Sequence, residues 1–553
     1  MIGQPRTNSE RLFLEIMPKQ RVNLDALIRR EDLEIRADEG TDASRSGGDL
    51  TFGNLRDGDN TFEILRKPDF QRDTCDWSPE AVVELIKNQL DDELIPAVIL
   101  WKSPNNEIFT IDGAHRLSAL IAWVNDDYGA GVTSQRFFSN KISPAQKKAA
   151  NYTQQLVDTE IGSFKLLEGY IRNKKGATTL QIKRANAIGS ARIRTQWVLG
   201  GANKAQDSFL RINRGGVAID DTEKEIILAR DQPECIATRA LLRAGTGHQY
   251  WWKFSHKAKQ EIVSLASQIH ELLFSPQFED NTRAYELLPM AGNSYSRDKL
   301  TTLYDLVFVA NQLPAGAPKV QNIEIVQQKT IAYLKTILRL SETALSDESH
   351  SLGLHPAVYC YTSTGKFQPA AFFAEMQFIQ QIIATKQTLQ EFTKARAKFE
   401  DFLVEHKYFL NQLIHKLGSR TRGLPRISKL YSMALKCVEE GKSSAEIKDT
   451  ILKDKDFSQL SEYASRHIPG APGDFKATAK AAVRLREILE TAKRCPECRA
   501  RMHSYGTTID HDIREEDGGL SDSSNGQSMH PFCNTGAKER REAMAKKQKQ
   551  HPT

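Results

Sequence analysis

Three cysteines and one histidine near the C-terminus have the spacing of metal ligands. Two residues separate Cys495 from Cys498, and two separate His530 from Cys533. Four ligands on two short loops satisfy the tetrahedral geometry of Zn²⁺ and leave no open position, so the predicted zinc site is structural. A segment this small has little apolar core of its own, and metal binding would supply part of its folding free energy.

A second set of polar residues lies between these two loops and directly after them. The set consists of Asp510, His511, Asn525 and Asn534, with the turn Gly518-Gly519 among them. Hydrolysis of a phosphodiester needs a base that activates water and a cation that binds the phosphate, and these side chains supply both kinds of group. Carboxylate and amide oxygens favour Mg²⁺ or Mn²⁺ over zinc. A solvated loop explains any one of these residues alone, but the combination favours a nuclease.

The sequence from Arg494 to Lys538 resembles the HNH nuclease family at all these positions at once. The resemblance implies a β-hairpin followed by a helix, wrapped around a metal ion. It makes His511 the general base and gives Asp510 and Asn534 to the Mg²⁺ or Mn²⁺ ion. It also assigns Asn525 the task of bracing the loop that carries His511.

The chain departs from the usual HNH pattern in three places. Asp512 and Arg514 stand where the family usually has an isoleucine and a proline. Ala537 stands where a lysine is common, with Lys538 one place later, and His530 replaces a usual cysteine. None of these changes removes a catalytic group, so we expect activity and leave the fit of the substrate open.

A strand-to-helix turn in the first half of the chain, at residues 111–117, is a candidate anion site. Gly113 follows Asp112 and allows a tight turn, and the helix start offers unpaired N–H groups. Arg116 adds a guanidinium that suits phosphate. Many strand–helix units carry a glycine and an arginine here without binding anything, so the turn alone leaves both interpretations open.

Segments 68–72, 111–117 and 209–216 together resemble the ParB-like domain with the motif Asp-Gly-Gln-Gln-Arg, over about Phe62 to Asp231. That domain opens GmrSD-type modification-dependent restriction enzymes and SspE proteins, and a related form occurs in DndB-like regulators. The resemblance implies binding or hydrolysis of a nucleotide (NTP), coupled to recognition of modified phage DNA. The residues carried over to the nucleotide pocket are Gln71, Arg72, Asp112, Gly113, His115, Arg116 and Asn213. Ala114 replaces a glutamine of the motif and so removes one side-chain amide from the pocket, which puts hydrolysis in question more than binding.

Length and composition predict an α+β multidomain protein. The chain has 553 residues, a net charge of +6 and seven cysteines, which favours a cytoplasmic protein with a metal site and free thiols over disulfides. The longest apolar run, Leu94 to Trp101, is too short to cross a membrane. We expect an N-terminal segment with an acidic linker (1–60), a ParB-like α/β domain (61–235), a helical domain (236–470) and a nuclease module with a basic tail (471–553).

Periodicity places the elements within these domains. Ser78 and Pro79 predict the start of a helix, strands are expected at 97–101 and 108–111, and a second helix from 114. Amphipathic stretches at 322–340, 378–410 and 427–442 predict an all-helical region, and 476–493 a basic helix. Acid-rich residues 31–60 indicate a solvated linker or mobile loop, and Pro469 to Gly473 a domain boundary.

The leading hypothesis is a DNA endonuclease of bacterial anti-phage defence, gated by a nucleotide, a DNA mark or assembly, with a homo-oligomer left open. The basic tail at 537–549 suits contact with phosphate as well as simple solubility. Tyr170, Trp251 and Trp252 suit stacking on bases, although large aromatic residues more often belong to the core. The alternatives are a mobile-element HNH endonuclease and a non-catalytic DNA-binding regulator of the ParB or DndB type.

Overall fold

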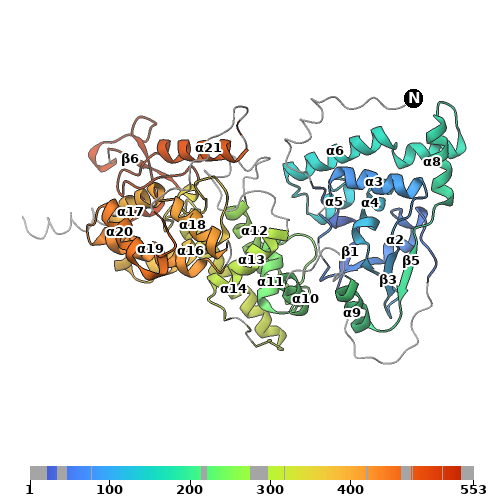
Figure 1. Ribbon diagram of the computed structural model, residues 1–553, viewed down its shortest axis with the longest axis horizontal. Coiled ribbons are helices and arrows are strands. Elements are labelled where there is room, and N and C mark those ends of the chain that lie inside the picture. Colours follow the sequence, from blue (N-terminus) through green and yellow to red (C-terminus); the bar gives the residue numbers. More distant parts are fainter. Residues whose placement is uncertain are drawn as a thin grey trace, which may run out of the picture. The chain divides into compact units, whose positions relative to one another are not determined.

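The chain divides into two compact units (Figure 1). The computed structural model describes residues 21–33, 47–71, 73–75, 77–212, 221–274, 297–314, 316, 318–418, 421–461, 475, 477–513 and 515–536. The first unit comprises Met1–Arg230 and Thr246–Tyr250, and the second comprises Asp231–Gly245 and Trp251–Thr553.

A five-stranded mixed sheet forms the centre of the first unit. Its strands, in spatial order, are β1 (Arg29–Glu31), β2 (Leu65–Pro68), β4 (Ile108–Asp112), β3 (Val98–Lys102) and β5 (Thr195–Val198). Neighbouring strands are parallel except β3 and β4, which are antiparallel. The strands predicted at 97–101 and 108–111 are therefore confirmed as β3 and β4.

Helices cover both faces of this sheet (Figure 1). The helices of the first unit are α2 (Asn60–Ile64), α3 (Pro79–Leu90), α4 (Ala114–Asn125), α5 (Val132–Phe137), α6 (Pro144–Glu160), α7 (Phe164–Arg172), α8 (Thr179–Ser190), α9 (Ala202–Ile212) and α10 (Asp221–Leu228), with short 3₁₀ turns at Asp25–Leu27 and Gly53–Leu55. Alternate residues of β3 point to opposite faces, so Leu100 joins the large core under α3 and α4 while Trp101 joins a smaller core under α9. The Ser78 hydroxyl caps α3 by accepting from the Ala81 amide at 3.3 Å, which confirms the predicted helix start.

The acid-rich segment 31–60 is not a solvated linker where the structure describes it. Glu31 ends strand β1, and Leu50, Phe52 and Leu55 are buried in the core of the first unit. Acidic residues dominate the composition of this segment. Its three apolar side chains nevertheless hold it on the core, because their burial stabilises the fold. Residues 34–46 lie outside the described part of the chain.

The second unit consists mainly of helices. They are α11 (Pro233–Leu242), α12 (His256–Phe274), α13 (Arg297–Ala310), α14 (Ile323–Leu345), α15 (Pro356–Tyr359), α16 (Pro369–Ile382), α17 (Lys386–Glu405), α18 (Tyr408–Leu417), α19 (Leu424–Glu439), α20 (Ser444–Lys453) and α21 (Ala477–Thr491), with 3₁₀ turns at Lys455–Phe457 and Glu515–Asp517. A hairpin of β6 (Thr508–His511) and β7 (Gly526–Met529) follows α21. The predicted helices at 322–340, 427–442 and 476–493 are confirmed as α14, α19 and α21. The boundary predicted at Pro469 to Gly473 lies outside the described residues.

The amphipathic stretch 378–410 is divided among three helices, although it contains neither proline nor glycine. Thr385 starts α17 with a capping box, in which its hydroxyl accepts from the Thr388 amide at 3.1 Å. His406 ends the same helix, and α18 begins at Tyr408. A side-chain cap therefore sets the start of α17, and hydrophobic periodicity alone does not locate this boundary.

All seven cysteines are buried, and none of them forms a disulfide. Among the described residues, no helix combines the length and the apolar character that a membrane crossing requires.

Candidate functional site

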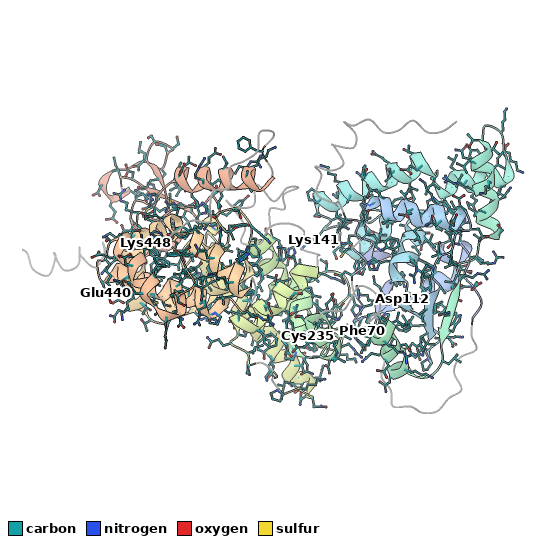
Figure 2. The ribbon with its side chains drawn as sticks, viewed as in Figure 1. Phe70, Asp112, Lys141, Cys235, Glu440 and Lys448 are labelled. Carbon is teal, nitrogen blue, oxygen red and sulfur yellow. The ribbon has the colours of Figure 1, made fainter. Side chains whose placement is uncertain are left out.

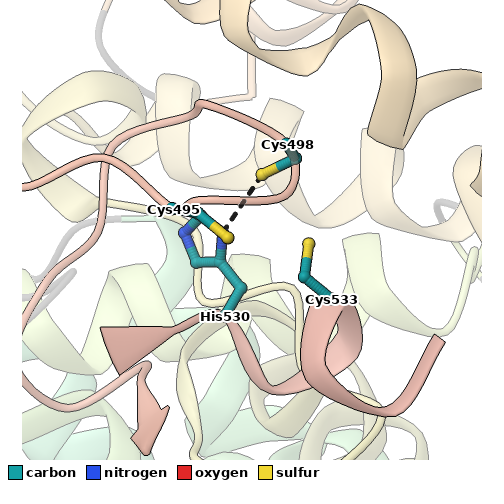
Figure 3. Close-up of side chains that lie close together, drawn as sticks. All are labelled: Cys495, Cys498, His530 and Cys533. Carbon is teal, nitrogen blue, oxygen red and sulfur yellow. Dashed lines mark hydrogen bonds between the residues drawn. The ribbon is translucent and has the colours of Figure 1, made fainter. Parts of the chain in front are cut away.

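The four predicted zinc ligands lie together in the second unit (Figure 3). One ligand atom from each of Cys495, Cys498, His530 and Cys533 lies within 4.8 Å of all the others, and all four residues are buried. Cys498 Sγ is 3.3 Å from His530 Nδ1. Three sulfurs and one imidazole nitrogen at this spacing fit a tetrahedral Zn²⁺ ion, so the donor set passes the chemical test for a structural zinc site.

Hydrogen bonds shape the loop that carries the first two ligands. The Cys495 amide donates to the Ala500 carbonyl at 2.9 Å, and the Arg499 amide donates to the Cys495 carbonyl at 2.9 Å. Arg499 adopts a left-handed conformation with φ of +62°, which turns the chain back sharply. Hydrogen bonds with Cys498 and Cys533 lower the pKa of the Cys495 thiol, and the hydrogen bond with Cys495 raises the pKa of the Cys498 thiol to about 11.

The hairpin β6–β7 presents the predicted catalytic residues. Asp510 and His511 close β6, and the register pairs Asp510 with Gln527 and His511 with Gly526. The Asn534 amide group donates to Thr508 Oγ1 at 3.3 Å. Because side chains alternate along a strand, Thr508 and Asp510 share one face of β6, and Asn534 lies against that face. Asp510, His511 and Asn534 are each partly exposed, as residues that meet a substrate need to be.

Asn525 ties together the loop that joins the two strands. Its Oδ1 accepts from the Ile513 amide at 2.7 Å, while its Nδ2 donates to the carbonyls of Ile513 at 2.7 Å and Leu520 at 2.9 Å. Gly519 packs so closely that a Cβ there would lie 1.8 Å from the Ile513 carbonyl oxygen. The hydrogen bonds of the Asn525 side chain and the close packing of Gly519 therefore fix the loop that follows His511.

Sequence reasoning missed one neighbour of the predicted general base. His511 Nε2 lies 3.0 Å from the Ser521 hydroxyl, which comes from the same loop. Serine is common in polar loops, and no spacing rule distinguishes this one. Arg514 and residues 537–553, which include Lys538 and the basic tail, lie outside the described residues.

The turn at Asp112 and Gly113 joins β4 to α4 in the first unit (Figure 2). Gly113 has φ of +91°, and a Cβ there would lie 3.0 Å from Arg116 Nη2. Arg116 Nη2 contacts Asp112 Oδ2 at 2.7 Å and donates to the Ala97 carbonyl at 3.3 Å. The Gln71 side chain donates to the Ile111 carbonyl at 3.4 Å. Gln71, Asp112, Gly113 and Arg116 therefore meet around one turn.

His115, which lies between Asp112 and Arg116 in the sequence, packs on an aromatic ring. Its imidazole stacks on Trp77 with ring centroids 5.9 Å apart and an interplanar angle of 27°. Gln71 Oε1 and Arg116 Nε are buried atoms without a hydrogen-bond partner in the described structure. Arg72 and Asn213, the remaining predicted pocket residues, lie outside the described residues.

A buried charge cluster anchors the segment that carries Gln71, and the sequence did not reveal it. Asp25 Oδ1 contacts Lys67 Nζ at 2.6 Å and Arg30 Nη2 at 2.8 Å, and accepts from the Thr74 amide at 3.0 Å. Arg30 Nη1 also donates to the Gln71 carbonyl. The segment around residue 25 therefore holds the loop after β2 in place.

The three aromatic residues considered for base stacking have different environments. Trp251 is only 1% exposed and belongs to the core of the second unit. Tyr170 packs partly buried against the core of the first unit. Trp252 is 45% exposed, and Lys253 Nζ lies 5.0 Å from its ring centroid. Of the three, Trp252 alone offers a large accessible face.

Residues 52–229 match the family model described as the GmrSD restriction endonuclease, N-terminal domain. At the level of the family, the match indicates a restriction-endonuclease-type system of anti-phage defence that acts on DNA. The matched range covers about a third of the chain and contains the turn at Asp112, whereas the cysteine–histidine cluster lies outside it. No curated protein and no solved structure matches the chain.

Proposed function

We propose that the chain is a DNA endonuclease whose C-terminal hairpin cleaves phosphodiester bonds with the help of one Mg²⁺ or Mn²⁺ ion. The observation that carries the proposal is the hairpin itself. It carries Asp510 and His511 as successive residues at the end of β6, and Asn534 packs against the face of β6 that Thr508 and Asp510 share. The match of residues 52–229 to a restriction-endonuclease domain supports DNA as the substrate.

Each residue of the hairpin has a chemical task in this proposal. Asp510 and Asn534 hold the divalent ion through oxygen atoms, and the ion, when bound, stabilises charge on the scissile phosphate. His511 takes the proton from the attacking water, because a neutral imidazole nitrogen accepts a proton. Ser521 orients the imidazole through the contact at His511 Nε2, which directs the other ring nitrogen towards the substrate.

Mutation of the proposed base gives the direct test. We expect His511→Ala to abolish metal-dependent nicking of supercoiled plasmid while the protein stays folded and retains zinc. His415→Ala removes an exposed histidine of α18 and serves as the matched control with wild-type activity. Equal cutting by His511→Ala and wild type would refute the proposal. Absence of any cutting by the wild type, with or without modified DNA, would favour the non-catalytic regulator.

The first unit is the proposed sensor that gates the nuclease. Two buried polar atoms, Gln71 Oε1 and Arg116 Nε, lack a partner beside the turn at Gly113. A nucleotide phosphate would accept from Arg116 Nε, and a water bound to the nucleotide would donate to Gln71 Oε1. We expect NTP binding that Arg116→Ala weakens at least tenfold in a calorimetric titration. Ser190→Ala, at the exposed end of α8, is the control.

Comparison of DNA substrates separates a gated restriction enzyme from a mobile-element endonuclease. Cleavage of modified and unmodified phage DNA should differ, or should respond to added NTP, if the first unit is a gate. A mobile-element enzyme would instead cut one fixed site regardless of modification or NTP.

A further inference from the structure

The loop that carries the first two zinc ligands lies against helix α17, far away in the sequence. The Arg501 amide donates to Glu400 Oε2 at 3.1 Å, and the Arg501 guanidinium contacts Asp401 Oδ1 at 2.6 Å. Arg494, directly before Cys495, contacts the same carboxylate at 2.7 Å. The two acidic residues are therefore the point at which α17 binds the cysteine loop.

Arg501 also contacts the second ligand loop and the helix that precedes the first. Its carbonyl oxygen lies 3.0 Å from His530 Nε2, and its guanidinium donates to the Leu489 carbonyl on α21 at 2.9 Å. One residue thus joins a zinc ligand, α21 and α17. A displacement of α17 would reach the metal cluster through Arg501 and through Arg494 beside Cys495.

Glu400 is itself held rigidly inside the helical domain. It is fully buried, and its Oε1 accepts from Arg396 Nε at 2.7 Å and from the Tyr359 hydroxyl at 3.1 Å. Arg396 in turn donates to the carbonyls of Leu352 and Gly353, in the segment between α14 and α15. A buried ion pair such as Glu400–Arg396 adds little to the stability of the fold. It does favour one arrangement of the two side chains, because any other arrangement leaves a buried charge unpaired.

The segment between α14 and α15 makes a second contact with the module. The Phe532 amide, between the ligands His530 and Cys533, donates to the Ser351 carbonyl at 2.9 Å. Gly353 and Gly506 approach backbone to backbone, and a Cβ on Gly353 would lie 2.2 Å from the Gly506 carbonyl oxygen. Both ligand loops are therefore bonded to the helical domain.

We infer that Glu400 and Asp401 are positioning residues for the proposed nuclease: through Arg501 they fix the zinc-bearing module on α17, so that the helical domain sets the geometry in which the hairpin acts. This inference rests on the proposed endonuclease function and deepens it. The helical domain then affects the rate of cleavage through the position of the hairpin, because a misplacement of a catalytic group by about 1 Å can reduce the rate of the reaction about 100-fold.

Asp401 offers the cleanest test because its side chain is 47% exposed, and exposed ion pairs contribute little to global stability. The variants are Asp401→Ala, the conservative Asp401→Glu, and Asp449→Ala as a control on the exposed side of α20. In the full-length protein we expect Asp401→Ala to speed amide hydrogen exchange of Cys495 to Gly506 and zinc release to a chelator, each at least fivefold. Asp401→Glu should restore both, and Asp449→Ala should match the wild type.

The kinetic readout distinguishes positioning from plain stabilisation. With the melting temperature unchanged, Asp401→Ala should lower kcat for plasmid nicking about tenfold and leave KM unchanged. Unchanged exchange and zinc release in Asp401→Ala would overturn the docking, and faster exchange with an unchanged kcat would overturn the positioning role. If the wild type does not cut DNA, the endonuclease proposal fails, while exchange and zinc release still decide whether α17 holds the module.

A second variant tests the same docking from the other contact. Gly353→Ala forces the backbones of Gly353 and Gly506 apart and should reproduce the effects of Asp401→Ala.

Discussion

His530 Nε2 lies 3.0 Å from the carbonyl oxygen of Arg501. A carbonyl oxygen accepts hydrogen bonds and cannot donate, so Nε2 carries the ring proton and Nδ1 keeps its lone pair. Nδ1 is the nitrogen that faces the cysteines, 3.3 Å from Cys498 Sγ. The backbone therefore selects the tautomer in which His530 can bind a metal ion.

Loss of one ligand should abolish zinc binding. We expect one zinc per chain in the wild type and none after dialysis in Cys533→Ser, measured by atomic emission. The module should also lose stability, since three of the six residues of its small apolar core are themselves ligands. Cys437→Ser changes another buried thiol, on α19, and should retain the zinc. Full zinc content in Cys533→Ser would contradict the assignment.

Zinc binding should weaken as the pH falls. The pKa of Cys498 is raised to about 11 by its hydrogen bond with Cys495, so this thiol keeps its proton in the metal-free protein at pH 7. Zinc has to displace that proton, and binding therefore releases protons and becomes tighter as the pH rises. A titration with a competing chelator at pH 6, 7 and 8 measures the slope. An affinity that does not change with pH would argue against thiolate ligands.

A methyl group at Gly519 should disturb the hairpin site and spare the zinc site. The added Cβ would lie 1.8 Å from the Ile513 carbonyl oxygen and 2.7 Å from Asn525 Nδ2, so the loop after His511 must move. We expect Gly519→Ala to reduce nicking about 100-fold, which is the scale for a misplaced catalytic group. Gly189→Ala has open space around the new methyl group and should be active. Full zinc content in both variants would confine the effect to the loop.

The sequence predicted those parts of the site whose residues lie close together along the chain. Cys498 and His530 are 32 residues apart, and the spacing of the ligands was enough to predict the cluster, while the resemblance to the HNH family implied the hairpin. Glu400 lies 101 residues from its partner Arg501, and an acidic residue on an amphipathic helix looks the same whether it faces water or a buried arginine. Tertiary packing alone defines such contacts, so a single sequence did not reveal them.

The buried carboxyl of Glu375 should make the second unit less stable as the pH rises. Burial raises its pKa to about 8, and the hydrogen bond with Cys360, the charge of Glu400 and the charge of Arg396 contribute less. The folded state thus binds more protons than the unfolded state between about pH 4.5 and 8, so stability is full below this window and falls through it. Glu375→Gln should remove most of this dependence. Urea unfolding followed by circular dichroism at pH 5.5 and 8 measures it, and an unchanged pH dependence in the variant would contradict the role of Glu375.

Removal of Asp25 should destabilise the first unit far more than removal of its neighbour Asp73. The Asp25 carboxylate contacts both Lys67 and Arg30, whose side chains are fully buried, so Asp25→Ala removes a carboxylate from two buried cations at once. Breaking a buried ion pair in this way costs about 3–5 kcal/mol. Asp73 is partly exposed and pairs with Arg30 at 2.8 Å, and Asp73→Ala should cost about 1 kcal/mol or less. Thermal unfolding of the two variants tests the difference. Equal losses would mean that the loop carrying Gln71 does not depend on the segment around residue 25.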